Sequence, residues 1–268
     1  MTSDEIAEEL LAAYDGGTGV PLFSTRRGGL TLPDAYAAAD ALRRQRLARG
    51  ERPLGWKIGF TNRSIWERYR VHAPIWGPVW DSTVTQLDAV EHITSLAGLV
   101  QPRLEPEIVF GFARPPQADM GVADLVACLD WVAHGFEIVH THFDDWRFAA
   151  SDTVADFALH GRLFIGPRVP VRRFEDLRGD LARLQVALRR GGIEVDRGEG
   201  RIVLDGPLDA LHTWVDAMHT QTPQWRIAAG DVVTTGTITD AWPMAPGERW
   251  QSMLSETRLP GLTLHTVG

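Results

Sequence analysis

The chain has 268 residues, a formal net charge of −8 and 44% hydrophobic residues, as expected of a globular protein with a sizeable core. The acidic balance argues against nucleic-acid binding through a broad basic surface, and every apolar stretch is shorter than the roughly 18 residues that a membrane span needs. Cys128 is the only cysteine and the N-terminal segment lacks the basic and apolar regions of a secretory signal, so we expect a soluble, cytoplasmic protein.

Helical spacing of apolar residues predicts two N-terminal helices, over residues 2–14 and 32–49. We therefore predict an N-terminal helical arm over residues 1–52, followed by a main domain over residues 53–268. Further helices are predicted at residues 122–132, 152–159 and 208–220.

Short segments rich in β-branched and aromatic residues begin after Arg52, and Gly and Pro separate them. They predict strands at residues 55–61, 105–112, 136–140, 163–166 and 231–238, a weaker strand at 79–84 and a hairpin over 184–196. Because strands and helices do not alternate regularly, the pattern favours an α+β or mostly β fold over a doubly wound sheet. The sequence also contains no Walker or Rossmann glycine pattern.

One lysine, Lys57, stands among the 27 basic residues, and it lies between Trp56 and Ile58 in an apolar segment. A partly desolvated ammonium can lose its proton, whereas a guanidinium effectively cannot. Lys57 is therefore a candidate proton carrier. The alternative is that this lysine has no special role and remains by chance in a composition rich in arginine.

Three glutamates form the sharpest local feature of the sequence. Glu105 and Glu107 are two residues apart in a predicted strand, so their side chains point to the same face, where they need a cation or a proton. Glu137 lies in another apolar strand, where a lone carboxylate is costly to bury. Three carboxylates suit a hard ion such as Mg²⁺ or Mn²⁺. The alternative for the pair is an exposed strand edge with solvated side chains.

Three histidines, His134, His140 and His142, lie close to Glu137 in sequence and raise the alternative of zinc. Strand alternation places His140 and Glu137 on opposite faces. We therefore interpret these histidines as packing or supporting groups rather than as metal ligands.

Five segments resemble the fumarylacetoacetate hydrolase superfamily, and within it the branch of 2-oxopent-4-enoate hydratases and 4-oxalocrotonate decarboxylases. They include Gly-Trp-Lys-Ile-Gly-Phe-Thr, Pro-Ile-Trp-Gly and Leu-Glu-Pro-Glu-Ile, and they cover residues 55–61, 74–77, 104–108, 137–156 and 229–247. The resemblance implies a mixed β roll or distorted barrel preceded by helices, so that residues 53–268 form a catalytic β-roll domain.

The resemblance also implies roles for individual residues. Glu105, Glu107 and Glu137 are expected to be the metal ligands, with Lys57 in the active site and Asp81 orienting a catalytic water or proton. The expected substrate contacts are Thr237, Leu104 and Leu159.

Two segments depart from the family pattern. His140-Thr141-His142 stands where such hydratases have Asp-Ser-Arg, which removes a possible carboxylate-binding arginine. Residues 157–160 (Phe-Ala-Leu-His) replace a polar Asn-Ala-Ser wall, so we predict that the substrate is not the simplest dienoate. We interpret His160 as a subgroup-specific acid or base, with a packing role as the alternative.

The leading hypothesis is hydration of a 2-hydroxy-2,4-dienoate, a small 2-oxo acid of aromatic-compound catabolism, by a homo-oligomeric lyase. Lys57, with its pKa lowered by the metal and by partial desolvation, would move a proton to or from the carbon skeleton. The alternatives are decarboxylation of a 2-oxo diacid, hydrolysis of an acylpyruvate with His160 or His134 activating water, and a non-catalytic partner subunit.

Overall fold

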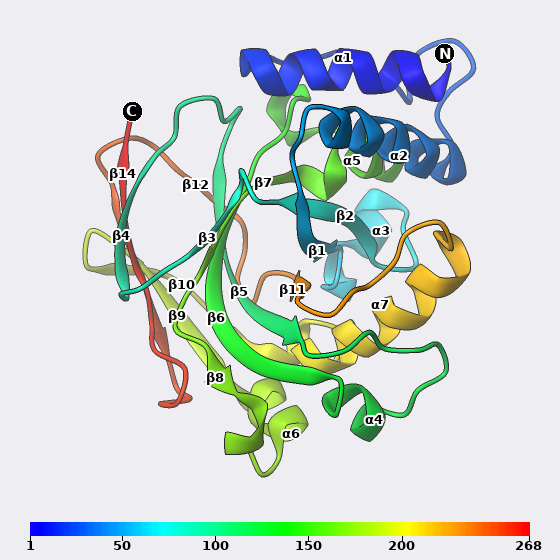
Figure 1. Cartoon of the computed structure of the whole chain (residues 1–268). Helices are drawn as coiled ribbons and strands as arrows, with labels where there is room; N and C mark the ends of the chain where they lie inside the picture. Colours follow the sequence, from blue (N-terminus) through cyan, green and yellow to red (C-terminus); the bar gives the residue numbers. More distant parts are fainter.

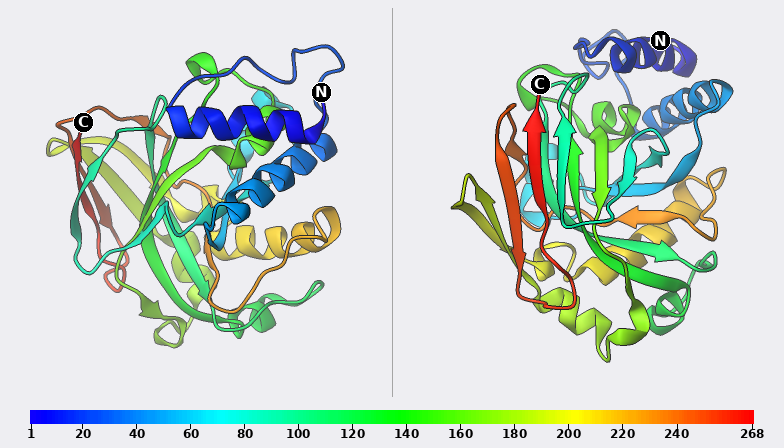
Figure 2. Two further views of the ribbon diagram at one scale, coloured as in Figure 1. Left: turned by 45° about the horizontal axis from the view of Figure 1, so that its top comes forward. Right: turned by 60° about the vertical axis from the view of Figure 1, so that its left-hand side comes forward.

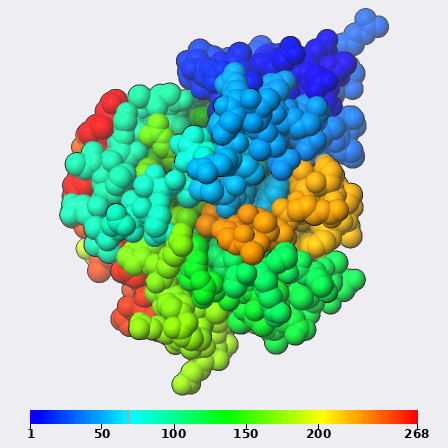
Figure 3. All heavy atoms as spheres, viewed as in Figure 1, coloured from blue at the N-terminus to red at the C-terminus, as the bar shows by residue number. Residues whose placement is uncertain are grey.

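The computed structural model describes residues 1–268, apart from the side chain of Arg68. Helices gather around a strongly curved sheet, and α1 and α2, drawn in blue, form one end of the molecule (Figure 1, Figure 3). The helices are α1 Ser3–Gly16, α2 Leu32–Ala48, α3 Trp66–Tyr69, α4 Val122–Val126, α5 Ala150–Ala155, α6 Leu177–Arg183 and α7 Pro207–Gln221. Short 3-10 turns, η1 to η5, cover Arg63–Ile65, Asp144–Trp146, Phe157–Leu159, Val171–Arg173 and Gly200–Ile202.

The strands of the described residues form two sheets, one of nine strands and one of five. The larger sheet has the order β2-β1-β11-β5-β6-β7-β3, with β12 beside β5 and β8 beside β6. Its strands are β1 Pro53–Gly59, β2 Ile75–Trp80, β3 Val84–Gln86, β5 Arg103–Phe112, β6 Leu129–Val139, β7 His160–Ile165, β8 Val169–Pro170, β11 Val232–Thr234 and β12 Trp242–Pro243. The smaller sheet has the order β10-β9-β13-β14-β4, with β4 Glu91–Ser95, β9 Gln185–Arg190, β10 Ile193–Glu199, β13 Arg249–Leu254 and β14 Thr263–Val267.

A layer of apolar side chains joins the two sheets. Leu104 and Phe136 from the larger sheet pack in one buried cluster with Leu188 and Trp250 from the smaller sheet. Figure 2 shows the smaller sheet, which ends in the red strand β14, lying along one side of the curved larger sheet. This mixed roll with preceding helices confirms the predicted α+β fold class.

The N-terminal helices share a core with the larger sheet. α1 begins at a capping box between Thr2 and Glu5, and α2 packs against both α1 and α5. Leu10 and Leu42 from these helices lie in the same buried cluster as Trp76 of β2. The boundary between an arm and a catalytic domain therefore stays a prediction.

Strands β1, β11 and β5 lie side by side at the centre of the larger sheet. β1 is parallel to β11, which is antiparallel to β5, so that Lys57 is paired with Thr234 and Thr234 with Val109. Gly55 permits this close approach, because a Cβ there would lie 1.9 Å from the carbonyl oxygen of Val232. Helix α7 contacts β1 through Trp214, whose ring centroid lies 6.4 Å from that of Trp56.

Several predicted boundaries were wrong. β2 ends at Trp80, where a turn closes through Thr83 N to Trp80 O, so the weak strand prediction at 79–84 covers a turn. The helix predicted at 122–132 stops at Val126, because the following residues pair with the far end of β5. The hairpin over 184–196 and the helix at 208–220 are confirmed. No helix among the described residues combines the length and apolar character needed to cross a bilayer.

Candidate active site

Strands β5 and β6 bring the three glutamates together. Glu105 and Glu107 point to one face of β5, and Glu137 lies directly opposite Glu105 in the antiparallel register. One carboxylate oxygen from each lies within 4.8 Å of the others. Glu107 and Glu137 are fully buried and the Glu105 side chain is 13% exposed. These positions exclude the exposed strand edge considered from the sequence.

Burial makes the negative charge of this cluster costly. It raises the pKa of Glu105 and of Glu107 from 4.5 to about 8, and neighbouring carboxylates add to the rise while Lys57 opposes it. Burial also raises the pKa of Glu137. The three side chains therefore need a cation to be ionised together at neutral pH.

The hydrogen bonds leave oxygens available for such a cation. Glu107 Oε2 accepts from Thr234 Oγ1 and from Gly236 N, at 2.8 Å from the latter, whereas Glu107 Oε1 has no hydrogen-bond partner among the described residues. Glu137 Oε1 accepts from His160, and its Oε2 lies 3.3 Å from Lys57 Nζ. An oxygen-only donor set fits a hard divalent ion. Gly236, at φ 100°, allows the turn that aims its N–H at Glu107.

Lys57 projects from β1 toward this cluster and is 4% exposed. Its Nζ lies 3.3 Å from Glu137 Oε2 and 3.9 Å from Glu105 Oε2. Burial alone would lower its pKa, but the nearby glutamates together raise it above the usual 10.5 in the metal-free chain. This rise in the pKa of Lys57 is opposite to the predicted fall. The fall would require a bound metal that offsets the charge of the glutamates, so it stays a prediction.

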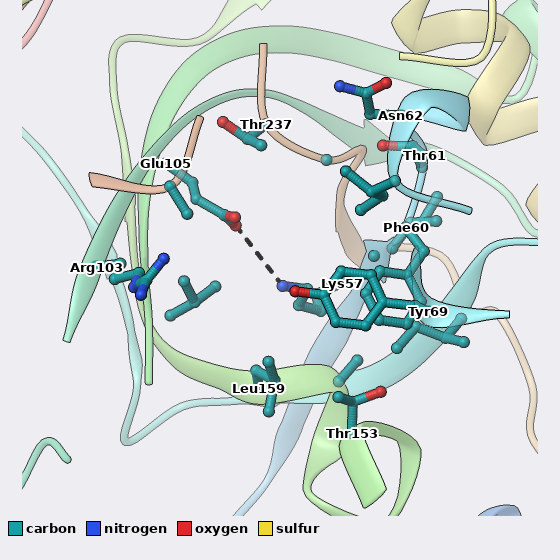
Figure 4. A pocket seen from close by; sticks show the side chains of 18 of the residues that line it. Lys57, Phe60, Thr61, Asn62, Tyr69, Arg103, Glu105, Thr153, Leu159 and Thr237 are labelled. Atoms are coloured by element: carbon teal, nitrogen blue, oxygen red, sulfur yellow. Dashed lines mark ion pairs between the residues drawn. The ribbon is translucent and has the colours of Figure 1, made fainter. Parts of the chain in front are cut away.

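A cavity of about 320 Å³ opens onto Lys57 and Glu105 (Figure 4). One wall consists of three stacked rings: Tyr69 lies 5.0 Å from Phe60 and 5.5 Å from Phe148, measured between centroids. The polar groups of the wall include Thr237, Asn62 and Arg103. The cavity therefore joins the carboxylate cluster to an aromatic surface.

The predicted substrate contacts are only partly brought to this cavity. Thr237 and Leu159 lie in its wall. Leu104 does not: its side chain is fully buried between the two sheets, because alternation along β5 turns it away from the face that carries Glu105. The side chain of Leu104 therefore does not face the described wall, and a substrate contact at this residue stays a prediction.

Asp81 also lies away from the described cavity wall. It follows the end of β2, and its Oδ2 accepts a hydrogen bond of 2.9 Å from Arg52 Nε, while Oδ1 accepts from Arg52 N. Hydrogen bonds from Arg52 lower the pKa of Asp81, and the one from the Arg52 backbone is the larger cause. A role in orienting a catalytic water or proton needs a place at the cavity, and this role of Asp81 stays a prediction.

His160 lies behind the cluster rather than in the described wall of the cavity. Its Nδ1 is 2.7 Å from Glu137 Oε1 and its Nε2 is 2.8 Å from Thr83 Oγ1. Burial, followed by the charges of Lys57 and Arg46, holds its pKa well below 6.5, so the ring is neutral. A neutral ring that donates from Nδ1 and accepts at Nε2 satisfies both contacts. His160 is therefore placed to orient Glu137, and its role as a subgroup-specific acid or base stays a prediction.

The three histidines that lie close to Glu137 in sequence, His134, His140 and His142, are buried. His134 Nε2 lies 2.7 Å from Ser252 Oγ, and His142 Nδ1 lies 2.8 Å from Asp156. Burial lowers the pKa of His134 to about 4 and that of His140 to about 3. None of the three joins the convergent ligand group found in the described part of the chain. This placement agrees with packing or support and disfavours zinc.

Sequence reasoning missed two parts of the site. Arg103 shares the face of β5 that carries Glu105, so the same alternation could have indicated it. The aromatic wall comes from separate segments around Phe60, Tyr69 and Phe148, and no spacing in the sequence links them.

Known proteins match most of this chain, although no model of a protein family matches it. It is 32% identical over 227 residues to 2-hydroxyhexa-2,4-dienoate hydratase of Comamonas testosteroni. The matched region covers 84% of this chain and 83% of that protein. It is also 32% identical over 257 residues to 2-keto-4-pentenoate hydratase 1 of Dechloromonas aromatica, covering 93% and 92%.

Among solved structures, 4-oxalocrotonate decarboxylase from Pseudomonas putida, complexed with magnesium and adipate, shares the fold. The TM-score is 0.89 at 24% identity, over 99% of this chain and 97% of that one. These matches confirm the resemblance found in the sequence. The chain therefore belongs to the fumarylacetoacetate hydrolase superfamily, as an enzyme of the branch that holds the 2-keto-4-pentenoate hydratases and the 4-oxalocrotonate decarboxylases.

Proposed function

We propose that the chain is a divalent-metal-dependent lyase that adds water to a 2-hydroxy-2,4-dienoate. The carrying observation is the cluster of three carboxylates, one of which, Glu105, lines a cavity together with the single lysine. The relatives at 32% identity are named as hydratases of 2-hydroxyhexa-2,4-dienoate and 2-keto-4-pentenoate, which supports the same substrate class here.

Glu105, Glu107 and Glu137 would hold the ion, and their oxygen-only set favours Mg²⁺ or Mn²⁺. When bound, the ion supplies Lewis-acid stabilisation of negative charge on the 2-oxo group. Thr234 and Gly236 fix one oxygen of Glu107 by donating hydrogen bonds to it, so that the other oxygen faces the cluster.

Lys57 would carry the proton. Its Nζ lies at the cavity wall beside Glu137 and Glu105, so it is placed to give a proton to, or take one from, the carbon chain of a substrate held next to the cluster. The aromatic wall would keep bulk water from that carbon chain. Thr237 would bind the substrate carboxylate, for which its hydroxyl must release Thr239 O, its present acceptor at 2.9 Å.

Decarboxylation of a 2-oxo diacid is the second candidate. The observation that favours it is the guanidinium of Arg103 in the cavity wall. Hydrolysis of an acylpyruvate is less favoured, since both histidines considered as water activators, His134 and His160, are buried outside the described wall. We further propose that the enzyme works as a homo-oligomer, with residues 1–52 as a helical arm.

A direct assay tests the proposed function. The Mg²⁺-loaded enzyme is offered 2-hydroxy-2,4-dienoates, 2-oxo diacids and acylpyruvates while ultraviolet absorbance and CO₂ release are followed. Hydration predicts loss of dienoate absorbance without CO₂, whereas CO₂ release identifies decarboxylation. No turnover of any substrate with Mg²⁺ or Mn²⁺ contradicts an enzymatic role.

Lys57→Met tests the role of the lysine. We expect turnover to be abolished while calorimetry still detects metal binding, since the variant removes the proton carrier and leaves the glutamates in place. Arg52→Met, which removes a surface cation outside the cavity, is the matched control and should keep activity. Retained activity in Lys57→Met would refute the assignment.

A further inference from the structure

The turn between β2 and β3 places a hydroxyl group behind the glutamate cluster. Thr83 Oγ1 lies 2.8 Å from Nε2 of His160, whose Nδ1 lies 2.7 Å from Glu137 Oε1. The buried ring of His160 therefore stands between the hydroxyl and the carboxylate. His160 belongs to the segment that departs from the family pattern, so the resemblance to the family assigns no role to these contacts.

The backbone fixes Thr83 in this place. Its N–H donates a 2.9 Å hydrogen bond to Trp80 O, and its carbonyl oxygen accepts one of 2.9 Å from Leu163 N. The second bond lies at the start of the parallel pairing of β3 with β7, and His160 is the first residue of β7. Thr83 and His160 are therefore held relative to each other by the same pair of strands.

The position of the hydroxyl proton follows from the other contacts of Thr83. Oγ1 accepts a 3.1 Å hydrogen bond from Trp80 N, so its own proton points elsewhere. Trp80 O, at 3.1 Å, already accepts from Thr83 N, whereas His160 Nε2 is nearer, at 2.8 Å. A neutral imidazole carries one proton and accepts at its other nitrogen. We therefore expect Thr83 to donate to Nε2, which leaves the ring proton on Nδ1.

The hydrogen bonds of this row then all run in one direction. Trp80 N donates to Thr83, Thr83 donates to His160, and His160 donates to Glu137. The first donor is a backbone N–H, which cannot accept, and the last acceptor is a carboxylate. Hydrogen bonds in such a row polarise one another, so that each strengthens the next. Loss of the hydroxyl would therefore weaken the bond to Glu137 and leave His160 Nε2 without this donor.

We propose that Thr83 is a positioning residue of the metal site, which fixes His160 as a hydrogen-bond donor to Glu137. The inference rests on the proposed function, because it takes Glu137 as a ligand of the divalent ion. Outer hydrogen-bond partners orient metal ligands and raise metal affinity. Thr83 lies outside the described wall of the substrate cavity, so its effect on metal affinity passes through His160.

Calorimetric titration of the metal-free chain with Mn²⁺ tests the proposal. Thr83→Val keeps the branched shape and removes the hydroxyl, and it should weaken Mn²⁺ binding by about 3- to 10-fold. Thr83→Ser keeps the hydroxyl and should bind Mn²⁺ as the wild type does. Valine is preferred to alanine, because Thr83 also lines a second cavity of about 240 Å³, from which water could take the place of the hydroxyl.

Thr266→Val is the matched control. The Thr266 hydroxyl also accepts from a backbone N–H, that of Glu248 at 2.9 Å, and donates to Ala245 O at 2.6 Å, but it lies on β14 in the smaller sheet. This variant should leave Mn²⁺ affinity unchanged. An equal loss of affinity in Thr266→Val and Thr83→Val would show a general effect of losing a hydroxyl, and it would contradict the proposal.

A double-mutant cycle shows whether Thr83 acts through His160. In the His160→Leu background, Thr83→Val should cause no further loss of Mn²⁺ affinity, since the ring that transmits the effect is absent. The same fold-loss in both backgrounds would show that the hydroxyl acts by another route, and the proposal would fail.

Nitrogen NMR spectroscopy of the Mg²⁺-loaded enzyme observes the ring directly, and His160→Leu identifies its signals. We expect a proton on Nδ1 and none on Nε2, and a proton on Nε2 would overturn the proposal. This measurement on the wild type decides the question if thermal melting shows that Thr83→Val does not fold. Wild-type Mn²⁺ affinity in a folded Thr83→Val would also overturn the proposal and leave the proposed function standing. If the wild-type chain binds neither Mn²⁺ nor Mg²⁺, the proposed function and the role of Thr83 fail together.

Discussion

Replacing His160 should weaken metal binding even though His160 is not itself a proposed ligand. Its Nδ1 donates a 2.7 Å hydrogen bond to Glu137 Oε1, and both residues are buried. His160→Leu removes that donor from a buried carboxylate, which costs about 1.5–3 kcal/mol. Replacing a group that hydrogen-bonds to a metal ligand typically lowers metal affinity by about 10- to 100-fold, which corresponds to about 1.4–2.7 kcal/mol. The two estimates agree, so we expect a loss in that range.

Calorimetric titration of the metal-free chain with Mn²⁺ measures this loss without relying on turnover. His160→Asn, whose amide N–H can take the place of Nδ1–H, should recover part of the affinity. His140→Leu is the matched control: it removes another buried imidazole, whose Nδ1 accepts from Val100 N at 3.4 Å. It should leave Mn²⁺ affinity unchanged. Wild-type affinity in His160→Leu would refute the orienting role.

Two further predictions concern the charge of the cluster. In EDTA, the melting temperature should fall as pH rises from about 4.5 to about 8. In this range Glu105 and Glu107 keep protons in the folded chain that the unfolded chain has released. Mg²⁺ should reverse the trend, and a melting temperature that rises with pH in EDTA would contradict the prediction. Glu107→Gln should weaken Mn²⁺ binding by more than the roughly 100-fold typical of supporting groups, yet raise the melting temperature of the metal-free chain at pH 8, since a buried charge becomes a neutral amide. Scanning fluorimetry with and without metal checks both, and a lower metal-free melting temperature in Glu107→Gln would count against the second.

Much of the candidate site could be predicted because its residues are costly in any apolar strand. Two glutamates at spacing two, a third in a hydrophobic run and one lysine among apolar neighbours all require compensation, whatever the fold. Alternation along a strand then fixes which residues share a face. The same rule would have turned the Leu104 side chain away from the face that carries Glu105, and it would have indicated Arg103.

The features that sequence spacing could not predict share a different physical cause. Asp81 follows a strand end, and the turn between Trp80 and Thr83 decides where its side chain points, which sequence spacing does not reveal. His160 lies beside the site, but its role depends on which neighbour contacts each ring nitrogen. Those neighbours are Thr83, in the turn before β3, and Glu137 of β6. The start of β6 was assigned to a helix because local propensity does not show that these residues pair with the far end of β5.

The register between β5 and β6 links the fold directly to the proposed chemistry. Glu105 lies opposite Glu137, and a slip of one residue would turn Glu137 to the other face of the sheet, away from Glu105 and Lys57. Apolar residues on both strands oppose such a slip, since it would also expose Phe136 and Ile138, which are buried between the two sheets. The hydrophobic pattern that closes the roll therefore also keeps three mutually repelling carboxylates together. The metal-free cluster costs stability, and a bound cation would offset that cost only in this register, so correct folding and metal binding should favour the same strand alignment.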